Sequence, residues 1–230
     1  MRTIQEHSLI AAVIPTFDVA AELAPLLADL DASPLVAEII VADGGSRDAT
    51  LAVALTGARV VQAPRGRGTQ LAAGAAAATS DWLLFLHADC RPAEGWEDAV
   101  RAFVTVSDAS GHAGYFALAF DDTTQAARRL ERLVAWRCRV LALPYGDQGL
   151  LISRALYDAV GGYAAIPLME DVDIVRRLGR HRLKPIGATI RTSAKRYRRD
   201  GYRRRALRNL CCLTLYFLGV KPARIARLYE

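Results

Sequence analysis

WLLFLHAD (82–89) is an apolar stretch that runs into a histidine and an aspartate, and Pro92 closes the pattern. Three similar apolar stretches precede it along the chain: LIAAVIPTF (9–17), AEIIVADGG (37–45) and ARVVQAP (58–64). Each of the three is followed by a segment whose composition is typical of a helix. Because strands covered on both faces are apolar almost throughout, this alternation predicts an α/β protein with a mostly parallel central sheet and helices on both faces.

The second half of the chain is less regular. YFALAF (115–120), GLLISR (149–154) and KPIGATIRTS (184–193) predict strands, and a long amphipathic helix is expected over 123–143. EDVDIVRRLGRH (170–181) begins with acids and ends with bases, which is the polarity that a helix dipole favours. No repeat, low-complexity tract or linker separates these segments. The sequence therefore predicts one main domain.

A basic segment follows this domain, which we place at residues 1–194, and we expect an amphipathic helical extension over residues 195–230. KRYRRDGYRRRALR (195–208) contains one acid, Asp200, and accounts for much of the net charge of +6. Such a block favours an anionic partner, namely phosphate, nucleic acid or a membrane surface. A solvated helix face explains the charge run equally well, and the chain has no recognisable nucleic-acid-binding motif.

The compartment can be predicted from the cysteines and the apolar runs. The four cysteines form no CxxC pair, which argues against a zinc site or a disulfide framework and favours a reducing environment. The start of the chain lacks a convincing cleavage site for a signal peptide. The apolar run at 210–220 has about half of the ~20 residues that a membrane-spanning helix needs. We expect a cytoplasmic protein, either free or peripheral on the inner face of the cell membrane.

Polar residues follow three of the predicted strands at the point where each strand ends. They are Pro15-Thr16, Asp43-Gly44-Gly45-Ser46 and His87-Ala88-Asp89. In an open parallel sheet, ligands bind outside the carboxyl ends of the strands. These three groups are therefore expected to converge on one ligand site.

Four ordered segments resemble the family 2 glycosyltransferases of the GT-A fold. They are AAVIPTFD (11–18), IIVADGGSRDAT (39–50), the segment from APRGRGTQ to FLHADC (63–90), and the segment from PYGDQG to MEDVDIVRRL (144–178). The GRGTQ, FLHAD and PYGDQ variants look most like a small bacterial subgroup called rSAM/selenodomain-associated transferase 2. The resemblance implies a nucleotide-sugar donor, a divalent metal, and inversion at the anomeric carbon.

The resemblance also divides the domain into a nucleotide-binding half (1–92) and an acceptor half (93–194). In the family, the aspartate that matches Asp43 contacts the nucleobase, typically uracil, and the donor is expected to be a UDP- or GDP-sugar. From the residues alone, DGGS is also good turn chemistry. The full set of expected donor contacts is Pro15, Thr16, Asp43, Gly44, Arg65, Arg67, Ala88, Asp89 and Arg196. Arginine fits phosphate geometry well, and the glycines beside Arg65 and Arg67 allow close backbone approach.

The family usually carries an Asp-x-Asp motif where this chain has His87-Ala88-Asp89. The second acid of that motif holds Mg²⁺ or Mn²⁺ against the donor diphosphate, so Asp89 is the expected anchor. Hard cations take one or two carboxylates and fill the remaining positions with phosphate and water. His87 either joins as a nitrogen ligand, which suits Mn²⁺ better than Mg²⁺, or contacts the donor, or marks a weakened metal site.

The acceptor side is expected at LMEDVD (168–173). The family's base maps to Asp171, with Glu170 orienting the acceptor or the base, although acids at a helix start are also favoured by the helix dipole. Two turn-rich segments, PYGDQG and GGY, are expected to line the acceptor pocket with Asp147, Gln148, Gly162 and Tyr163, and the first two of these look exposed. Arg196 lies in SAKRY, which loosely matches the family's Gln-x-x-Arg-Trp element but lacks the Gln and has Tyr in place of Trp.

Two alternatives to a glycosyltransferase remain open at this point. A sugar nucleotidyltransferase shares the doubly wound fold but usually has a glycine-rich loop after the first strand, and IPTFDVAAE has no glycine. A non-catalytic, membrane-peripheral binding protein would use the basic tail. The amphipathic tail helix could lie among lipid headgroups, pack on the domain or form a homodimer, and a lipid-linked acceptor is one hypothesis. We expect no nucleic-acid partner.

Overall fold

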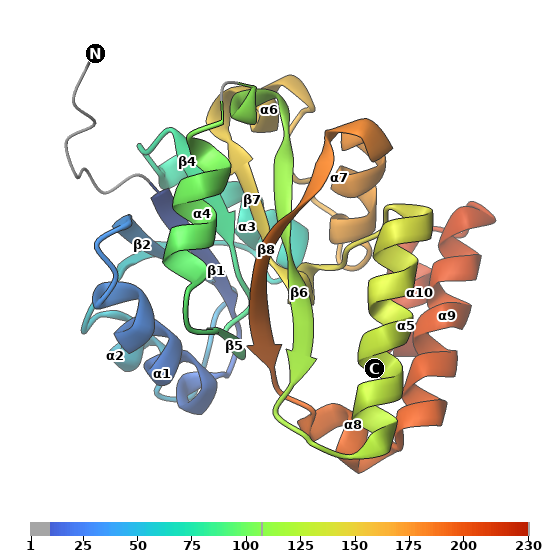
Figure 1. The fold of residues 1–230 in the computed structure, drawn as a ribbon. Coiled ribbons are helices and arrows are strands. Elements are labelled where there is room, and N and C mark those ends of the chain that lie inside the picture. The colour runs from blue at the N-terminus through green and yellow to red at the C-terminus, as the bar shows by residue number, and fades with distance from the viewer. Residues whose placement is uncertain (1–9, 107, 230) are drawn as a thin grey trace.

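An eight-stranded β-sheet forms the centre of the protein, and helices cover both of its faces (Figure 1). The computed structural model describes residues 10–106 and 108–229. The strands are, in chain order, β1 Ile10–Thr16, β2 Val36–Asp43, β3 Arg59–Gln62, β4 Trp82–Phe85, β5 Cys90–Pro92, β6 Ala113–Phe120, β7 Leu150–Ser153 and β8 Leu183–Thr192. The α-helices are α1 Ala20–Asp31, α2 Thr50–Ala54, α3 Arg67–Ala77, α4 Trp96–Val104, α5 Gln125–Leu141, α6 Arg154–Ala159, α7 Glu170–Leu178, α8 Lys195–Asp200, α9 Tyr202–Phe217 and α10 Pro222–Tyr229.

The sheet has the strand order β3-β2-β1-β4-β7-β6-β8-β5. Parallel pairs join β3, β2, β1 and β4, as the alternation of strands and helices predicts. β7 runs antiparallel to both β4 and β6, β8 is parallel to β6, and β5 is antiparallel to β8. The α/β fold class is confirmed, and the less regular second half of the sequence is the mixed part of the sheet. Because β7 reverses between them, β4, β6 and β8 all end at the same edge.

The core has one layer on each face of the sheet. On one face, Leu23 and Leu30 of α1 pack with Trp96 of α4 against the sheet. On the other face, Leu71 of α3 and Val134 of α5 belong to a second cluster that also includes residues of α7 and α9. The small residues of α3 let this helix lie close to β1 and β2.

The predicted C-terminal extension is helical and packs on the second of these clusters. Cys212 and Leu213 of α9 and Ile225 of α10 are buried there together with residues of α5. Figure 1 shows α5, α9 and α10 as one group of helices beside β6. No helix within residues 10–106 and 108–229 is long and apolar enough to cross a membrane.

The strand predicted over 82–89 ends earlier than expected, at Phe85. Leu86 still donates to the carbonyl of Val13, but the chain then turns, and the N–H of Cys90 donates to the carbonyl of His87 (3.0 Å). β5 follows this turn and pairs with β8, and neither β5 nor α4 was predicted. His87 and Asp89 therefore lie in a tight turn between two strands, which directs both of them toward the same side.

Candidate active site

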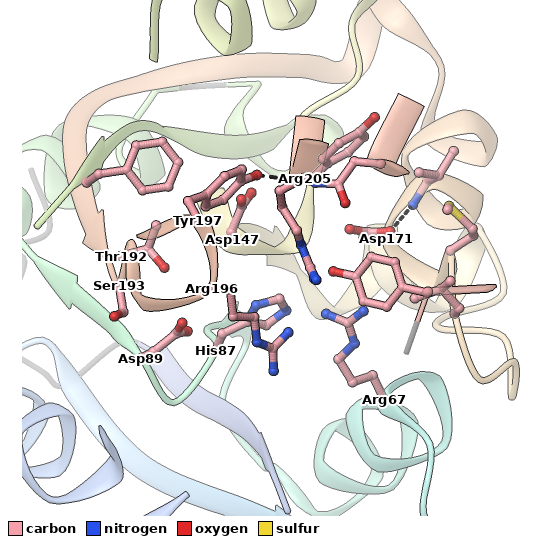
Figure 2. A pocket seen from close by; sticks show the side chains of 17 residues that line it. Arg67, His87, Asp89, Asp147, Asp171, Thr192, Ser193, Arg196, Tyr197 and Arg205 are labelled. Carbon is pink, nitrogen blue, oxygen red and sulfur yellow. Dashed lines mark hydrogen bonds between the residues drawn. The ribbon is translucent and has the colours of Figure 1, made fainter. Parts of the chain in front are cut away.

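A pocket of about 130 Å³ lies at the edge where β4, β6 and β8 end. Phe120 at the end of β6 and Thr192 at the end of β8 are part of its wall. Six of the residues predicted for the site line this pocket together, as Figure 2 shows: Arg67, His87, Asp89, Asp147, Asp171 and Arg196. The turn after β4, the start of α3, the start of α7 and α8 therefore meet at one place, although they are far apart in the sequence.

His87 is a neutral imidazole in this pocket. Burial lowers its pKa to about 3, and the nearby cations of Arg67 and Arg196 act in the same direction. The ring packs so closely on Gly146 that a Cβ there would lie 2.6 Å from Nε2. Near neutral pH one ring nitrogen of His87 therefore keeps a lone pair, which can accept a hydrogen bond or bind a metal.

Asp89 and Asp147 carry carboxyl groups in the pocket whose negative charge is only partly offset by their surroundings. Burial raises the pKa of Asp89, although the Arg196 cation opposes the shift. Burial also raises the pKa of Asp147 to about 6, against the opposing effect of Arg137 and with further contributions from Asp171 and Asp89. Oδ1 of Asp147 has no hydrogen-bond partner among the described residues. Half-buried carboxylates in this state favour a cation or a hydrogen-bond donor supplied by a ligand.

The carboxylate of Asp171, at the start of α7, is held by backbone N–H groups from two different segments. Gly146 donates to Oδ2 and Val172 donates to Oδ1, each at 2.8 Å. The residue before the acidic pair, Met169, has a left-handed backbone (φ 67°), which is uncommon for a side chain of this size. The Asp171 carboxylate is thereby fixed in orientation, and each oxygen keeps capacity for a further hydrogen bond.

Glu170 lies beneath the pocket and contacts Arg67. Oε1 of this fully buried carboxylate is 3.1 Å from Nε of Arg67. Burial raises the pKa of Glu170 to about 7, the Arg67 cation opposes that shift, and Asp171 adds to it. Burial lowers the pKa of Arg67, but Glu170 and Asp171 outweigh it, so the net pKa is raised and Arg67 stays cationic. Glu170 therefore acts on Arg67 rather than facing the cavity.

Gly68 determines how closely α3 approaches the segment before α7. A Cβ there would lie 2.8 Å from the carbonyl oxygen of Ile166 and closer still to that of Ala164. We expect Gly68→Ala to lower the free energy of unfolding by ~1–3 kcal/mol, because backbone atoms cannot rotate away. Urea denaturation measures this. Gly57→Ala is the control, since a Cβ at Gly57 meets nothing within 4 Å, and it should change stability by less than ~0.5 kcal/mol. An unchanged stability of the Gly68 variant would contradict the close packing.

Comparison with known families shows to which class of protein this chain belongs. The family described as Glycosyl transferase family 2 matches residues 11–167, which is more than half of the chain. The chain belongs to this family. It is an α/β glycosyltransferase of the GT-A fold. A comparison with curated proteins gave no match.

Two solved glycosyltransferases illustrate the shared fold. Glucosyl-3-phosphoglycerate synthase from Mycobacterium tuberculosis, in complex with Mn²⁺, UDP and glucosyl-3-phosphoglycerate, is 23% identical with a TM-score of 0.54, over 81% of this chain and 70% of that chain. Mannosyl-3-phosphoglycerate synthase from Rubrobacter xylanophilus is 19% identical with a TM-score of 0.57, over 92% of this chain and 75% of that chain. At these identities the likeness establishes the fold alone.

The strand ends expected to hold the nucleotide of the glycosyltransferase donor lie next to each other. Thr16 donates to Oδ1 of Asp43 (3.0 Å), and the N–H groups of Gly45 and Ser46 donate to Oδ2 (2.9 Å each). Burial alone would raise the pKa of Asp43, but these hydrogen bonds and one from the Ser46 hydroxyl outweigh it and lower the pKa. Asp43 is fully buried, so it fixes the loop after β2. Its contact with a base stays a prediction.

A glutamine that was not predicted connects these two strands. The amide of Gln70 on α3 donates to the carbonyls of Thr16 (2.7 Å) and Ala42 (2.9 Å). Gly44 leaves room for this amide, since a Cβ there would lie 3.1 Å from Nε2 of Gln70, which is a tight contact. GRGTQ therefore contributes a structural side chain as well as the pocket residue Arg67.

Several predicted site residues lie outside the pocket of this glycosyltransferase. Arg65 stacks over the ring of Phe17 at 4.0 Å. Tyr163 is buried against Phe85, edge to face. The expectation that Gln148 is exposed is wrong, because it is 1% exposed, and its side chain bonds Phe116 and Arg137. Pro15, Gly44, Ala88, Glu170 and Gly162 also do not line the cavity.

The C-terminal helices contribute pocket residues that sequence reasoning missed. Arg205 and Asn209 of α9 and Tyr229 of α10 line the cavity. The guanidinium of Arg205 lies over the ring of Tyr229 at 4.6 Å, and Nη1 contacts Asp200 at 3.2 Å. Arg205 was one of many arginines in a basic run, and the one signal that separates it is its position on the inner side of an amphipathic helix. Tyr229 carries no sequence signal.

The pocket offers a divalent cation only a few protein ligands. Among the described residues, no group of three or more His, Cys, Asp and Glu side chains could hold a metal. Asp89 nevertheless shares the cavity with Asp147, whose Oδ1 is partnerless, and with the neutral imidazole of His87. These residues fit Mg²⁺ or Mn²⁺ held by one or two carboxylates and otherwise by phosphate and water. They do not fit a cation enclosed by protein ligands.

Proposed function

We propose that the protein is an inverting glycosyltransferase that moves a sugar from a UDP- or GDP-sugar to an acceptor hydroxyl. The observation that carries the proposal is the placement of Asp89 and Asp171 on different sides of one pocket (Figure 2). The charge of Asp89 is only partly offset by its surroundings, so this carboxylate suits a cation. Asp171 is oriented by two backbone N–H groups and suits the acceptance of a proton. Transfer to a hydroxyl needs both functions within one cavity.

The donor diphosphate is assigned to the region between Arg67 and Arg196. Arg67 is a half-buried, permanent cation paired with Glu170, and Arg196 has no ion-pair partner among the described residues. Guanidinium groups bind phosphate oxygens with paired donors. The nucleoside then extends toward Thr16 and the loop fixed by Asp43. A UDP complex of the Mycobacterium tuberculosis neighbour agrees with this class of donor.

The chemistry of transfer requires charge stabilisation and proton removal. Asp89, with Asp147 or His87, would hold the divalent cation, which supplies positive charge beside the leaving diphosphate. The acceptor oxygen attacks the anomeric carbon on the face opposite the diphosphate, so the new C–O bond forms as the old one breaks. Asp171 takes the proton of the acceptor hydroxyl. Where Asp147 rather than His87 is the second ligand, the neutral imidazole of His87 accepts or donates one hydrogen bond at the sugar donor.

Asp171 and Tyr145 line one part of the cavity, close enough for the charge of Asp171 to contribute to the raised pKa of Tyr145. We assign the acceptor to this part. Asp147 lies between the two carboxylates and contributes to both regions. The GRGTQ, FLHAD and PYGDQ variants favour the rSAM/selenodomain-associated subgroup, and the name of this subgroup specifies no substrate.

A hydrolysis screen tests the proposal without knowledge of the acceptor. The intact protein is incubated with Mn²⁺ and UDP- and GDP-sugars, and release of the nucleoside diphosphate is followed over time. We expect slow release from one donor class that EDTA abolishes. If no nucleoside diphosphate is released from any donor, and calorimetry detects no binding of UDP or GDP with Mn²⁺, the proposed function is wrong.

A further inference from the structure

Two neighbouring helices turn apolar side chains away from the protein. On α5 these are Leu133, Trp136 and Val140, and on α9 they are Leu207, Leu210 and Phe217. We call these six residues, with the exposed arginines between them, the α5–α9 face. The two helices contact each other and lie side by side in Figure 1, and α10 packs against α9. The face belongs to the same side of the molecule as the C-terminal helices.

The spacing shows that each set forms a stripe. On α5 the exposed residues recur three and four positions apart, while Val134 and Cys138 on the opposite side of the helix are buried. Trp136 is 48% exposed and Leu207 is 65% exposed. A surface helix normally turns its apolar stripe to the core and its polar residues outward. These two helices have apolar residues on both sides, which marks the outer stripe as a contact surface.

The charge of the face is entirely basic. Arg129, Arg132 and Arg139 are exposed on α5, and Arg203 and Arg204 are exposed on α9. Within the described residues of α5, α9 and α10 no acidic side chain is exposed, since the one acid of α5, Glu131, is half-buried and bonds Arg128. The exposed apolar side chains therefore lie in a field of uncompensated positive charge.

We propose that the α5–α9 face binds the surface of a lipid bilayer that contains anionic phospholipids. Basic residues beside exposed Trp, Leu and Phe are the combination that inserts at the headgroup boundary, where the arginines meet phosphate and the apolar groups reach the acyl region. A second copy of the chain is disfavoured, because the same face would bring like charges together. Nucleic acid would satisfy the arginines but leave the exposed aliphatic side chains without a partner.

The position of the pocket gives this docking a consequence. α9 presents Leu207 and Leu210 outward, while its inner side supplies Arg205 and Asn209 to the cavity. One helix is thus part of both surfaces. Docking of the α5–α9 face holds the cavity next to the bilayer, and this arrangement is independent of the reaction that the cavity performs.

Vesicle flotation tests the proposal with the full chain. The protein is mixed with phosphatidylcholine vesicles, or with vesicles of phosphatidylcholine and phosphatidylglycerol in equal parts, and floated through a density gradient. We expect the protein to float with the anionic vesicles, to stay behind with neutral ones, and to dissociate at ~1 M salt, where charge screening is nearly complete. A protein that fails to float with anionic vesicles at low salt overturns the proposal.

Two variants separate charge from insertion. The triple variant R129E/R132E/R139E is expected to lower partitioning onto anionic vesicles at least ~100-fold, since each arginine near the surface contributes about fivefold. Trp136→Ser should lower it several-fold by removing an inserted ring. Two controls change exposed residues away from the face. R59E/K184E reverses two charges and is the control for the triple variant, and Leu55→Ser is the control for Trp136→Ser. Both should keep wild-type partitioning. None of these residues lines the cavity, so circular dichroism and nucleotide binding should stay unchanged in every variant.

Other occupants give distinct results. Concentration-dependent dimers in sedimentation velocity that Trp136→Ser abolishes, with no flotation, would assign the face to a second copy. Binding of duplex nucleic acid that the triple variant abolishes, with no flotation, would assign it to nucleic acid. Flotation that is equal for the triple variant and the wild type would mean that another surface binds the lipid. Each of these outcomes overturns the proposal.

Discussion

Replacing Asp171 by asparagine is expected to lower the rate of sugar transfer by ~10²–10⁴, because the acceptor hydroxyl would lose its general base. The substitution keeps the shape of the side chain, and the amide oxygen can still accept the hydrogen bond from Gly146 or Val172. Donor binding and fold should therefore be preserved. The measurement is the turnover number with the donor found by the hydrolysis screen, together with calorimetry of the nucleoside diphosphate.

A second acid at the start of a helix provides the matched control for Asp171. Asp98 lies in the first turn of α4, as Asp171 lies in the first turn of α7, but it is exposed and does not line the cavity. Asp98→Asn removes the same favourable interaction with a helix dipole and should leave turnover unchanged. If the Asp171 variant turned over at the wild-type rate, the assignment of the base would be wrong. If both variants lost activity and stability together, the loss of activity would come from weakened helices and not from a missing base.

The second large effect is expected from Asp89→Ala. This carboxylate is half-buried beside Arg196, and burial raises its pKa although the Arg196 cation opposes the shift. If it anchors the cation, its loss should weaken the Mn²⁺-dependent binding of UDP or GDP by more than the ~10–100-fold that loss of an outer-shell partner costs. Calorimetry with and without EDTA measures the effect. Glu94→Ala, an exposed acid in the segment before α4, is the control.

His87→Gln then decides among the three interpretations of the histidine. A ligand should give a loss close to that of Asp89→Ala, and a donor contact should give a smaller loss that persists in EDTA. A variant that binds like the wild type would mean that His87 only packs against Gly146. Metal-dependent binding that survives Asp89→Ala would show that Asp147 or another residue is the anchor.

The parallel part of the fold could be predicted from the sequence because its strands are apolar on both faces, and such runs have few other interpretations. The strand predicted over 82–89 runs past its end at Phe85 in the structure. The pattern of residues 86–89 does not reveal the hydrogen bond from Cys90 to His87 that closes the turn. Gln148 was placed on the surface because glutamine in a glycine-rich turn is usually solvated. In the structure it satisfies buried backbone groups, which depends on contacts with α5 and β6.

The six predicted residues that meet in the pocket were found through strand ends and the family resemblance. Arg205, Asn209 and Tyr229 could not be found in the same way, because they reach the cavity only through the packing of α9 and α10 on α5. The sequence placed residues 195–230 outside the main domain on account of their charge. Their inner side is nevertheless part of the core, and helical periodicity alone does not state which partner covers it.

Tyr229 bears on how the protein should be handled in the laboratory. Its ring contacts Arg205 at the wall of the cavity, so a peptide that continues the chain beyond α10 would start close to the pocket. β1 begins at Ile10, at the amino end of a strand whose other end approaches the nucleotide region. This amino end of β1 lies at the edge of the sheet opposite the cavity, so purification tags and fluorophores are better attached on the amino-terminal side. Kinetic data from C-terminally tagged protein should be repeated after the tag has been removed.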